Sequence, residues 1–344
     1  MKPYLQIIAE RQTLTQAQAE QAMHLMMRGE AAPEETAGLL MGLRARGETL
    51  DELVGFTRVM RQYAVPVTCD DPDAIDIVGT GGDGHGTFNI STTAVFVCAG
   101  AGVTVAKHGN RAVSSLAGSA DVLHALGVQT ELGREGVEFC LREAGLAFLF
   151  APFFHPAIRN VMPVRRALGV RTFFNILGPL CNPAGIRRQL VGAFSNSIAE
   201  RMIHILAALG AEHALTVHAE DGLDELSLAS PTTLFEFDRT TGAQPTPRTL
   251  TPEHHGLKRV TLAQLKGGTA DDNAVILQGV LRGEPGPFRD VVLLNAAYGL
   301  YTSGRFDSLD ACFDAARESL DSGNARKSLD RLIAVSQQAP GIGH

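Results

Sequence analysis

Five glycines within eight residues follow directly on a short apolar run that has the composition of a β-strand. The run is Ile75 to Val78, the glycines lie between Gly79 and Gly86, and an apolar helical pattern, Ala94 to Ala99, comes next. Glycine lets the backbone approach an anion closely, and the N–H groups at the start of a following helix point toward it. This segment therefore predicts a strand, a phosphate-binding loop and a helix in succession, rather than a tight turn without a ligand.

Further short β-branched runs follow, with helical patterns between several of them. The runs span 103–106, 146–150, 215–218 and 234–237, and the clearest helical patterns span 119–126 and 197–209. Strands that alternate with helices are typical of a mainly parallel sheet covered by helices, so we expect an α/β fold. The stretch 239–256, dense in Thr, Pro and His, is expected to be a surface excursion.

The residues before Pro66 have a different pattern, which predicts helices only. Thr15 with Gln18, and Thr49 with Glu52, form capping-box pairs, Gly29 ends the first helical pattern, and Pro33 suits the first turn of a second helix. We expect a helical domain over 1–66, joined by helices from about 160–185, and an α/β domain over 67–344.

Composition limits the classes of function. The chain is 45% hydrophobic and 19% charged, and it lacks both a long apolar run and a signal-like beginning, so we expect a cytoplasmic protein without a membrane partner. The formal charge of −7 argues against a nucleic-acid partner. The five cysteines contain no CxxC pair and therefore predict no zinc or dithiol site.

The glycine segment also satisfies the G-x-G-x-x-G spacing of dinucleotide-binding folds. Such a site needs an acidic residue about 20 residues later, yet no Asp or Glu occurs from Gly84 to Ala120, and the second predicted strand leads into Lys107. A Walker-type loop lacks its Lys-Ser or Lys-Thr pair. Lys107 and Asn110 instead predict a surface rich in hydrogen-bond donors beside the first loop. The alternative is that Lys107 and Arg111 are ordinary surface charges.

Long motifs resemble those of anthranilate phosphoribosyltransferases. They are GTGGDG with TFNIST from Gly79, KHGNRAVSS from Lys107, FAP with HPA from Phe150, VR with LG from Val164, RT with FNILGPL from Arg171, NPA from Asn182 and DGLDE from Asp221. One departure is Leu116-Ala117, where members of the family often carry polar residues.

The resemblance implies transfer of the 5-phosphoribosyl group from phosphoribosyl diphosphate to anthranilate in tryptophan biosynthesis, by a homodimer joined through the helical domain. The fold it implies is the two-domain type shared with nucleoside phosphorylases. Phosphoribosyl diphosphate would be held by Gly79, Gly82, Asp83, Thr87, Asn89, Ile90, Ser91, Thr92, Lys107, Ser115 and Ser119. Anthranilate would be held by Gly79, His108, Asn110, His155 and Arg165. Two Mg²⁺ ions would be held by Ser91, Asp224 and Glu225, and Lys107 would be the catalytic residue.

Physical chemistry is compatible with these roles. Carboxylate, hydroxyl and phosphate oxygens suit Mg²⁺, and a fixed lysine charge suits a departing diphosphate. An arginine fork suits the carboxylate of anthranilate, but only the resemblance separates Arg165 from Arg166, and His155 could equally pack beneath the pocket. The alternatives are a nucleoside phosphorylase, a nucleic-acid-binding relative without the chemistry, and a transferase for a different aromatic amine.

Overall fold

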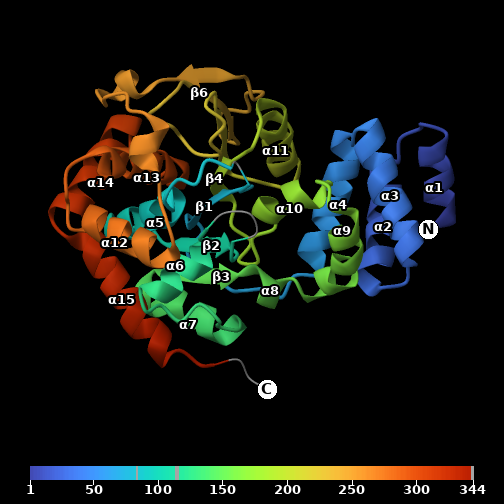
Figure 1. Cartoon of the computed structure of the whole chain (residues 1–344), viewed down its shortest axis with the longest axis horizontal. Coiled ribbons are helices and arrows are strands. Elements are labelled where there is room, and N and C mark those ends of the chain that lie inside the picture. Colours follow the sequence, from blue (N-terminus) through green and yellow to red (C-terminus); the bar gives the residue numbers. More distant parts are fainter. Residues whose placement is uncertain (83, 113–115, 342–344) are drawn as a thin grey trace.

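The chain begins with four helices, shown in blue in Figure 1. The structure, a computed structural model, describes residues 1–82, 84–112 and 116–341. The four helices are α1 (Lys2–Ala9), α2 (Gln16–Arg28), α3 (Pro33–Arg46) and α4 (Leu50–Gln62). In this unit α1 packs on α3 and α2 packs on α4.

The capping pairs act as the sequence predicts. The hydroxyls of Thr15 and Thr49 accept from the N–H groups of Gln18 and Glu52, and Gly29 ends α2 with a φ of 71°. Helix α1 is absent from the sequence predictions. It has no side-chain cap, and only Ile8 in it is buried, so its stability depends on packing that the local pattern does not reveal.

A seven-stranded sheet forms the centre of the molecule, with strand order β3-β2-β1-β4-β5-β6-β7. The strands are β1 (Ile75–Gly79), β2 (Val105–Gly109), β3 (Leu146–Phe150), β4 (Arg188–Gly192), β5 (His213–Ala219), β6 (Thr232–Asp238) and β7 (Arg248–Leu250). The pairs from β3 through β5 are parallel, and β6 and β7 pair antiparallel. The predicted α/β class with a mainly parallel sheet is confirmed.

Several predicted boundaries are wrong, and the sequence predictions contain neither β4 nor β7. Strand β2 begins at Val105 rather than residue 103, and helix α5 begins at Ile90 rather than Ala94, because polar Ser and Thr residues fill its first turn. Strand β4 begins with Arg188 and Gln189, whose polarity hid it. The predicted surface excursion contains β7, although most of its residues are exposed.

Helices cover both faces of the sheet and extend beyond it (Figure 1). They are α5 (Ile90–Gly100), α6 (Ser119–Ala125), α7 (Arg134–Ala144), α8 (Ala151–Phe154), α9 (Met162–Leu168), α10 (Phe174–Leu180), α11 (Asn196–Ala208), α12 (Ala270–Leu281), α13 (Pro287–Ser303), α14 (Leu309–Asp321) and α15 (Asn324–Gln338), with 3₁₀ turns η1 (Pro156–Asn160), η2 (Pro252–His255) and η3 (Leu262–Leu265). Helices α5 and α13 contact β1, and α11 contacts β5 and β6.

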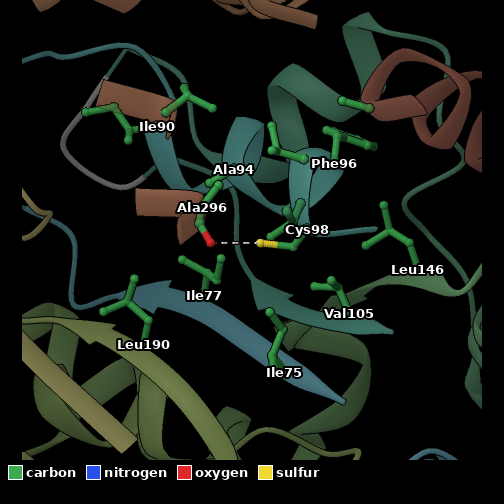
Figure 2. Packing of buried hydrophobic residues seen from close by; sticks show 14 of the residues in the cluster. Ile75, Ile77, Ile90, Ala94, Phe96, Cys98, Val105, Leu146, Leu190 and Ala296 are labelled. Atoms are coloured by element: carbon green, nitrogen blue, oxygen red, sulfur yellow. Dashed lines mark hydrogen bonds between the residues drawn. The ribbon is translucent and has the colours of Figure 1, made fainter. Parts of the chain in front are cut away.

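The larger core lies between the sheet and helix α5. Figure 2 shows side chains of β1 and its neighbours directed toward α5 and α13; labelled there are Ile75, Ile77, Val105, Leu146, Leu190, Ile90, Ala94, Phe96, Cys98 and Ala296. The Cys98 thiol donates to the carbonyl of Ala296 at 3.4 Å, so even this thiol serves packing between two helices. Burial of these apolar side chains holds the strand ends in place.

A second core joins the four N-terminal helices to later segments. Buried residues of α2, α3 and α4 cluster with Val164 of α9 and with Phe174 and Leu177 of α10. Helix α10 also contacts α11, which lies against the sheet. Two segments distant in sequence therefore form one body beside the sheet, as Figure 1 shows for α4, α9 and α10. Within the described part of the chain, no helix is both long and apolar enough to span a bilayer.

The crossing of α5 with α14 and α15 depends on Gly100. A Cβ at this position would lie 2.5 Å from the backbone nitrogen of Ala325, which cannot move independently of α15. We expect Gly100→Ala to lower the free energy of unfolding by about 1–3 kcal/mol, because close-packed helices do not tolerate an added methyl group.

Urea unfolding would measure the change, with Gly38→Ala as the matched control. A Cβ at Gly38 of α3 would meet only Leu5, at 3.4 Å, so this variant should be neutral or more stable by up to about 1 kcal/mol. Equal stability of the two variants would show that the helix crossing adapts.

Candidate active site

Strand β2 carries neighbouring side chains to opposite faces of the sheet, because successive residues of a strand alternate. Lys107 lies toward α5, where its Nζ donates to the carbonyl of Ile77 at 2.6 Å and to Oγ of Ser91 at 3.4 Å. His108 lies toward His155, with ring centroids 5.1 Å apart. Lys107 is only 2% exposed, which excludes the surface-charge alternative for this residue.

Burial lowers the pKa of Lys107 from its ordinary value, while the charges of Asp76, Glu225 and Asp224 oppose that shift. The lysine therefore depends on surrounding carboxylates to keep its charge in a site with little water. By contrast, Arg111 pairs with Glu131 at 2.5 Å and its side chain is 58% exposed. The surface interpretation is correct for Arg111.

The Asp224-Glu225 pair lies in the connection between β5 and β6. Because these strands are antiparallel, the connection returns at the carboxyl edge of the sheet instead of crossing it. Asp221 accepts from the Leu223 N–H at 3.1 Å and the Ser227 hydroxyl at 2.6 Å. Asn295 of α13 anchors the next residue, since its side chain exchanges hydrogen bonds with the backbone of Leu226. The pair is thus held on a rigid turn.

Asp224 lies directly against the ends of two neighbouring strands. Gly79 of β1 pairs with Gly192 of β4, and the two residues face the same acidic loop. A Cβ at Gly79 would be 2.5 Å from Oδ2 of Asp224, and one at Gly192 would be 2.5 Å from its carbonyl carbon. The glycines are required here by close approach, since neither position has room for a side chain.

The glycine loop is held at two adjacent residues. The N–H of Gly81 donates to Oδ2 of Asp224 at 2.6 Å, and the carbonyl of Gly82 accepts from Nη2 of Arg171 at 2.6 Å. Both glycines have positive φ, 66° and 72°, which glycine adopts without strain. The resemblance implied that Gly82 contacts phosphoribosyl diphosphate, but the sequence did not identify Arg171 as the hydrogen-bond partner of Gly82.

Ser91, Asp224 and Glu225, which the resemblance implies for a metal site, lie close together. The N–H of Ser91 donates to Oε1 of Glu225 at 3.2 Å, and Asp224 bonds the loop beside it. Burial and the charge of Asp224 raise the pKa of Glu225 to about 8. Two such carboxylates and a hydroxyl suit a hard cation that would relieve their repulsion. The described residues hold no group of three His, Cys, Asp or Glu arranged for a metal.

The other residues predicted to contact phosphoribosyl diphosphate surround the start of α5. The Thr92 hydroxyl donates to Oγ of Ser119 at 2.9 Å, which joins α5 to α6. The Asn89 amide donates to the Ala117 carbonyl at 3.3 Å, and Thr87 forms an isolated antiparallel β-bridge with Lys266. Ile90 is buried and can contribute only its backbone. Asp83 and Ser115 lie outside the described residues.

At Leu116-Ala117, where the sequence departs from the family pattern, one side chain is exposed and the other is buried. Leu116 is 75% exposed, whereas Ala117 is buried and its carbonyl is the acceptor for Asn89. An alanine at 117 therefore suits the packing, and Leu116 leaves apolar surface beside the donor loops.

Two histidines on the opposite face have unusual surroundings. His108 and His155 are both buried, and among the described residues Nε2 of His108 and both ring nitrogens of His155 have no hydrogen-bond partner of normal geometry. Burial lowers the pKa of His155 to about 4, and burial together with His155 lowers the pKa of His108. Both rings are therefore neutral at pH 7.

Arg165 and Asn110 are the remaining predicted acceptor contacts. Arg165 of α9 is partly buried, and its guanidinium lies 5.1 Å from the centre of the Phe174 ring, whereas Arg166 is exposed. Asn110 is exposed, and its side chain accepts from the N–H of Arg111 at 2.8 Å. Within the described residues, neither side chain shares a hydrogen bond or ion pair with another predicted site residue. The difference in burial gives a structural reason to choose Arg165 over Arg166.

A buried polar network beneath the site was missed by the sequence analysis. Asp76 of β1 accepts from the Asn182 amide at 2.8 Å and from the N–H of His108 at 3.2 Å, and Asn182 also donates to the Ala106 carbonyl at 2.8 Å. Burial raises the pKa of Asp76 to about 6 against the charge of Lys107. Asn182 lies in a motif quoted above, but an isolated polar residue in a sequence does not reveal its partners.

Comparisons with known proteins match the two units separately. Residues 2–64 match a model described as "Glycosyl transferase family, helical bundle domain", and residues 71–326 match "Glycosyl transferase family, a/b domain". An anthranilate phosphoribosyltransferase of Salinibacter ruber is 62% identical over 342 residues, covering 98% of this chain and 99% of the relative.

Solved structures agree with these matches. The crystal structure of anthranilate phosphoribosyltransferase from Thermus thermophilus has a TM-score of 0.91 and 44% identity, covering 97% of this chain and 99% of that one. Two structures are of the Saccharomyces cerevisiae enzyme, one in complex with PRPP (phosphoribosyl diphosphate) and Mg and one with 4-fluoroanthranilate. Each has a TM-score of 0.87 and 26% identity, and each match covers 98% of this chain and 97% of the yeast chain. Matched along nearly its whole length, the chain belongs to the anthranilate phosphoribosyltransferase family of glycosyl transferases.

Proposed function

We propose that this chain transfers the 5-phosphoribosyl group of phosphoribosyl diphosphate to the amine of anthranilate, releasing diphosphate, as a step of tryptophan biosynthesis. The observation that carries the proposal is the convergence of buried Lys107 and the Asp224-Glu225 turn on the glycine loop and the first turn of α5. Family membership supports the choice of both substrates.

The donor would lie across the glycine loop and the start of α5. Backbone groups of Gly79, Gly82 and Ile90, together with side chains at the first turn of the helix, offer N–H and hydroxyl donors to phosphate oxygens. The side chains assigned to this contact are Asp83, Thr87, Asn89, Ser91, Thr92, Lys107, Ser115 and Ser119. Asp224 and Glu225 with Ser91 would hold Mg²⁺, and two ions remain the number that we expect.

The reaction breaks the bond between ribose C1 and the diphosphate while positive charge develops on the ring. Mg²⁺, when bound, would neutralise charge on the departing diphosphate. Lys107 supplies a positive charge fixed by the Ile77 carbonyl and Ser91, so little reorganisation is needed as the bond breaks. Anthranilate is an aromatic amine, unprotonated at neutral pH, and its lone pair attacks C1 without a strong base. The acidic N–H of the resulting ammonium then loses a proton to water or to the released diphosphate.

The acceptor would lie on the other side of β2, near His108 and His155. Arg165 would bind the carboxylate of anthranilate, with Asn110 and the backbone of Gly79 completing the site. Neutral histidines suit this place, because an uncharged imidazole can donate or accept a hydrogen bond while its ring packs against an aromatic ligand.

Further features of the proposal rest on family resemblance. We expect a homodimer joined through the helical domain, a division into domains at 1–66 and 67–344 with helices from about 160–185 joining the first, and a cytoplasmic location without nucleic-acid or membrane partners. The shared core of α2, α3, α4, α9 and α10 supports that division.

The first test follows the fluorescence of anthranilate with purified protein and phosphoribosyl diphosphate. We expect a decrease that requires Mg²⁺, because the amine becomes ribosylated and diphosphate cannot leave readily without a cation. Replacing both Asp224 and Glu225 with Ala should abolish the decrease at every Mg²⁺ concentration. The control is exposed Glu220→Ala at the beginning of the same turn, which should keep the activity. Absence of a decrease in the wild-type protein would contradict the proposed function.

Arg165→Ala should raise the KM for anthranilate by roughly 10- to 100-fold, because a carboxylate then loses a bidentate partner. The KM for phosphoribosyl diphosphate should change little. Steady-state kinetics with each substrate varied in turn would measure both values, and Arg166→Ala is the matched control from the same helix. Equal increases in the two KM values would remove Arg165 from the acceptor site.

The depressed pKa of His155 predicts a pH dependence of stability. Between its folded value of about 4 and its ordinary value of 6.5, the unfolded chain binds the proton more tightly, so this residue destabilises the fold as pH falls. Lowering the pH from 7 to 5 should cost about 2 kcal/mol through His155 alone. Urea unfolding at both pH values should show a smaller loss in His155→Phe than in the wild type. An identical loss would mean that His155 can be protonated in the folded protein.

A further inference from the structure

We propose that Arg171 is a positioning residue that holds the tip of the glycine loop in its donor-binding shape. This inference rests on the proposed function, because the loop is the site assigned to phosphoribosyl diphosphate. Arg171 lies between α9 and α10, far from the loop in sequence, and it donates through Nη2 to the Gly82 carbonyl at 2.6 Å.

Both ends of the loop are anchored by other described residues. At its beginning, the N–H of Thr80 donates to the Gly192 carbonyl at 3.0 Å, and the N–H of Gly81 donates to Asp224. At its far end, the Gly86 carbonyl accepts from Gly267 at 2.9 Å, and the N–H of Phe88 donates to Leu265 at 3.1 Å. Between these anchors lies a run in which Gly81, Gly82, Gly84 and Gly86 all have positive φ. Glycines restrict the backbone least, so a contact at the tip has the greatest effect on its shape.

Arg171 itself is held in place by an aromatic ring. Its guanidinium carbon lies 4.5 Å from the centre of the Phe194 ring, just beyond the end of β4. A guanidinium stacks on such a ring while its edge remains free to donate, whereas a lysine ammonium cannot match that geometry. Phe194 follows β4 closely, so the ring lies close to the sheet edge, where it orients Arg171 toward the loop.

The position of Arg171 also joins the donor side to the acceptor side. It follows α9, which carries Arg165, and precedes Phe174, whose ring lies beneath the Arg165 guanidinium. One short segment therefore contacts both proposed substrate sites. Loss of Arg171 should loosen the donor loop first, since Arg165 keeps its own contacts with Phe174 and Met162.

The test compares Arg171→Ala, Arg171→Lys and Phe194→Leu with the control Arg166→Ala. We expect Arg171→Ala to raise the KM for phosphoribosyl diphosphate roughly tenfold, with the KM for anthranilate within about twofold of wild type and the melting temperature nearly unchanged. Arg171→Lys should recover part of the loss by donating without stacking, and Phe194→Leu should be intermediate. Arg166→Ala should resemble the wild type.

Hydrogen–deuterium exchange of the substrate-free proteins supplies a readout that does not need activity. Peptides covering residues 79–88 should exchange faster in Arg171→Ala than in wild type or Arg166→Ala. An inactive wild type with this difference in exchange would contradict the proposed function but leave the positioning role intact. Unchanged exchange with unchanged KM values, an equal increase in both KM values, or a lower melting temperature alone would overturn the positioning role.

Discussion

The close approach of Asp224 to the ends of β1 and β4 determines how the site is built. Only glycine at both 79 and 192 permits it, and the two are register partners, so one sheet edge provides one flat surface for the acidic turn. The same carboxylate then accepts from Gly81 and thereby sets where the glycine loop begins. The proposed metal site, the loop and the sheet are therefore not independent parts, because displacement of the turn would displace all three.

Successive side chains of a strand point to opposite faces of the sheet, and this alternation separates the two proposed substrate sites. Lys107 and His108 are consecutive, yet one joins the charged donor side against α5 and the other joins the neutral histidine pair near α8 and α10. Beneath them, the bonds of Asn182 to Asp76 and to the Ala106 carbonyl link β1 to β2. Charge is thus concentrated where a diphosphate would leave, and uncharged polar atoms are concentrated where an aromatic acid would bind.

Local signals in the sequence predicted much of the fold. Capping pairs at Thr15 and Thr49 defined the starts of two helices, and the glycine run after Ile75 to Val78 marked the loop between β1 and α5, because these signals act within a few residues. The site predictions for Ser91, Asp224 and Glu225 came from resemblance, and the structure brings these residues together without testing their roles. Binding of a substrate or Mg²⁺ by each one stays a prediction for the experiments above.

What the sequence could not predict depends on distant partners. Arg171 has the appearance of any exposed arginine until Gly82 and Phe194 are placed beside it, and Asn182 gains its meaning only from Asp76. Strand β4 was hidden because its first two residues are polar, although Gln189 is buried and donates to the Pro179 carbonyl. Tertiary contacts, not local propensity, decide such positions.

Because β6 runs antiparallel to β5, the two connections that flank β6 differ in how well they should tolerate inserted or deleted residues. The connection that carries Asp224, residues 220–231, joins two antiparallel strands and packs on Asn295 and on two glycines, so one inserted residue would shift the acidic pair relative to the sheet. The next connection, residues 239–247, is exposed for most of its length and lies beside the edge strand β7. This exposed loop should therefore tolerate insertions and deletions without displacing the site, whereas the connection that carries Asp224 should not.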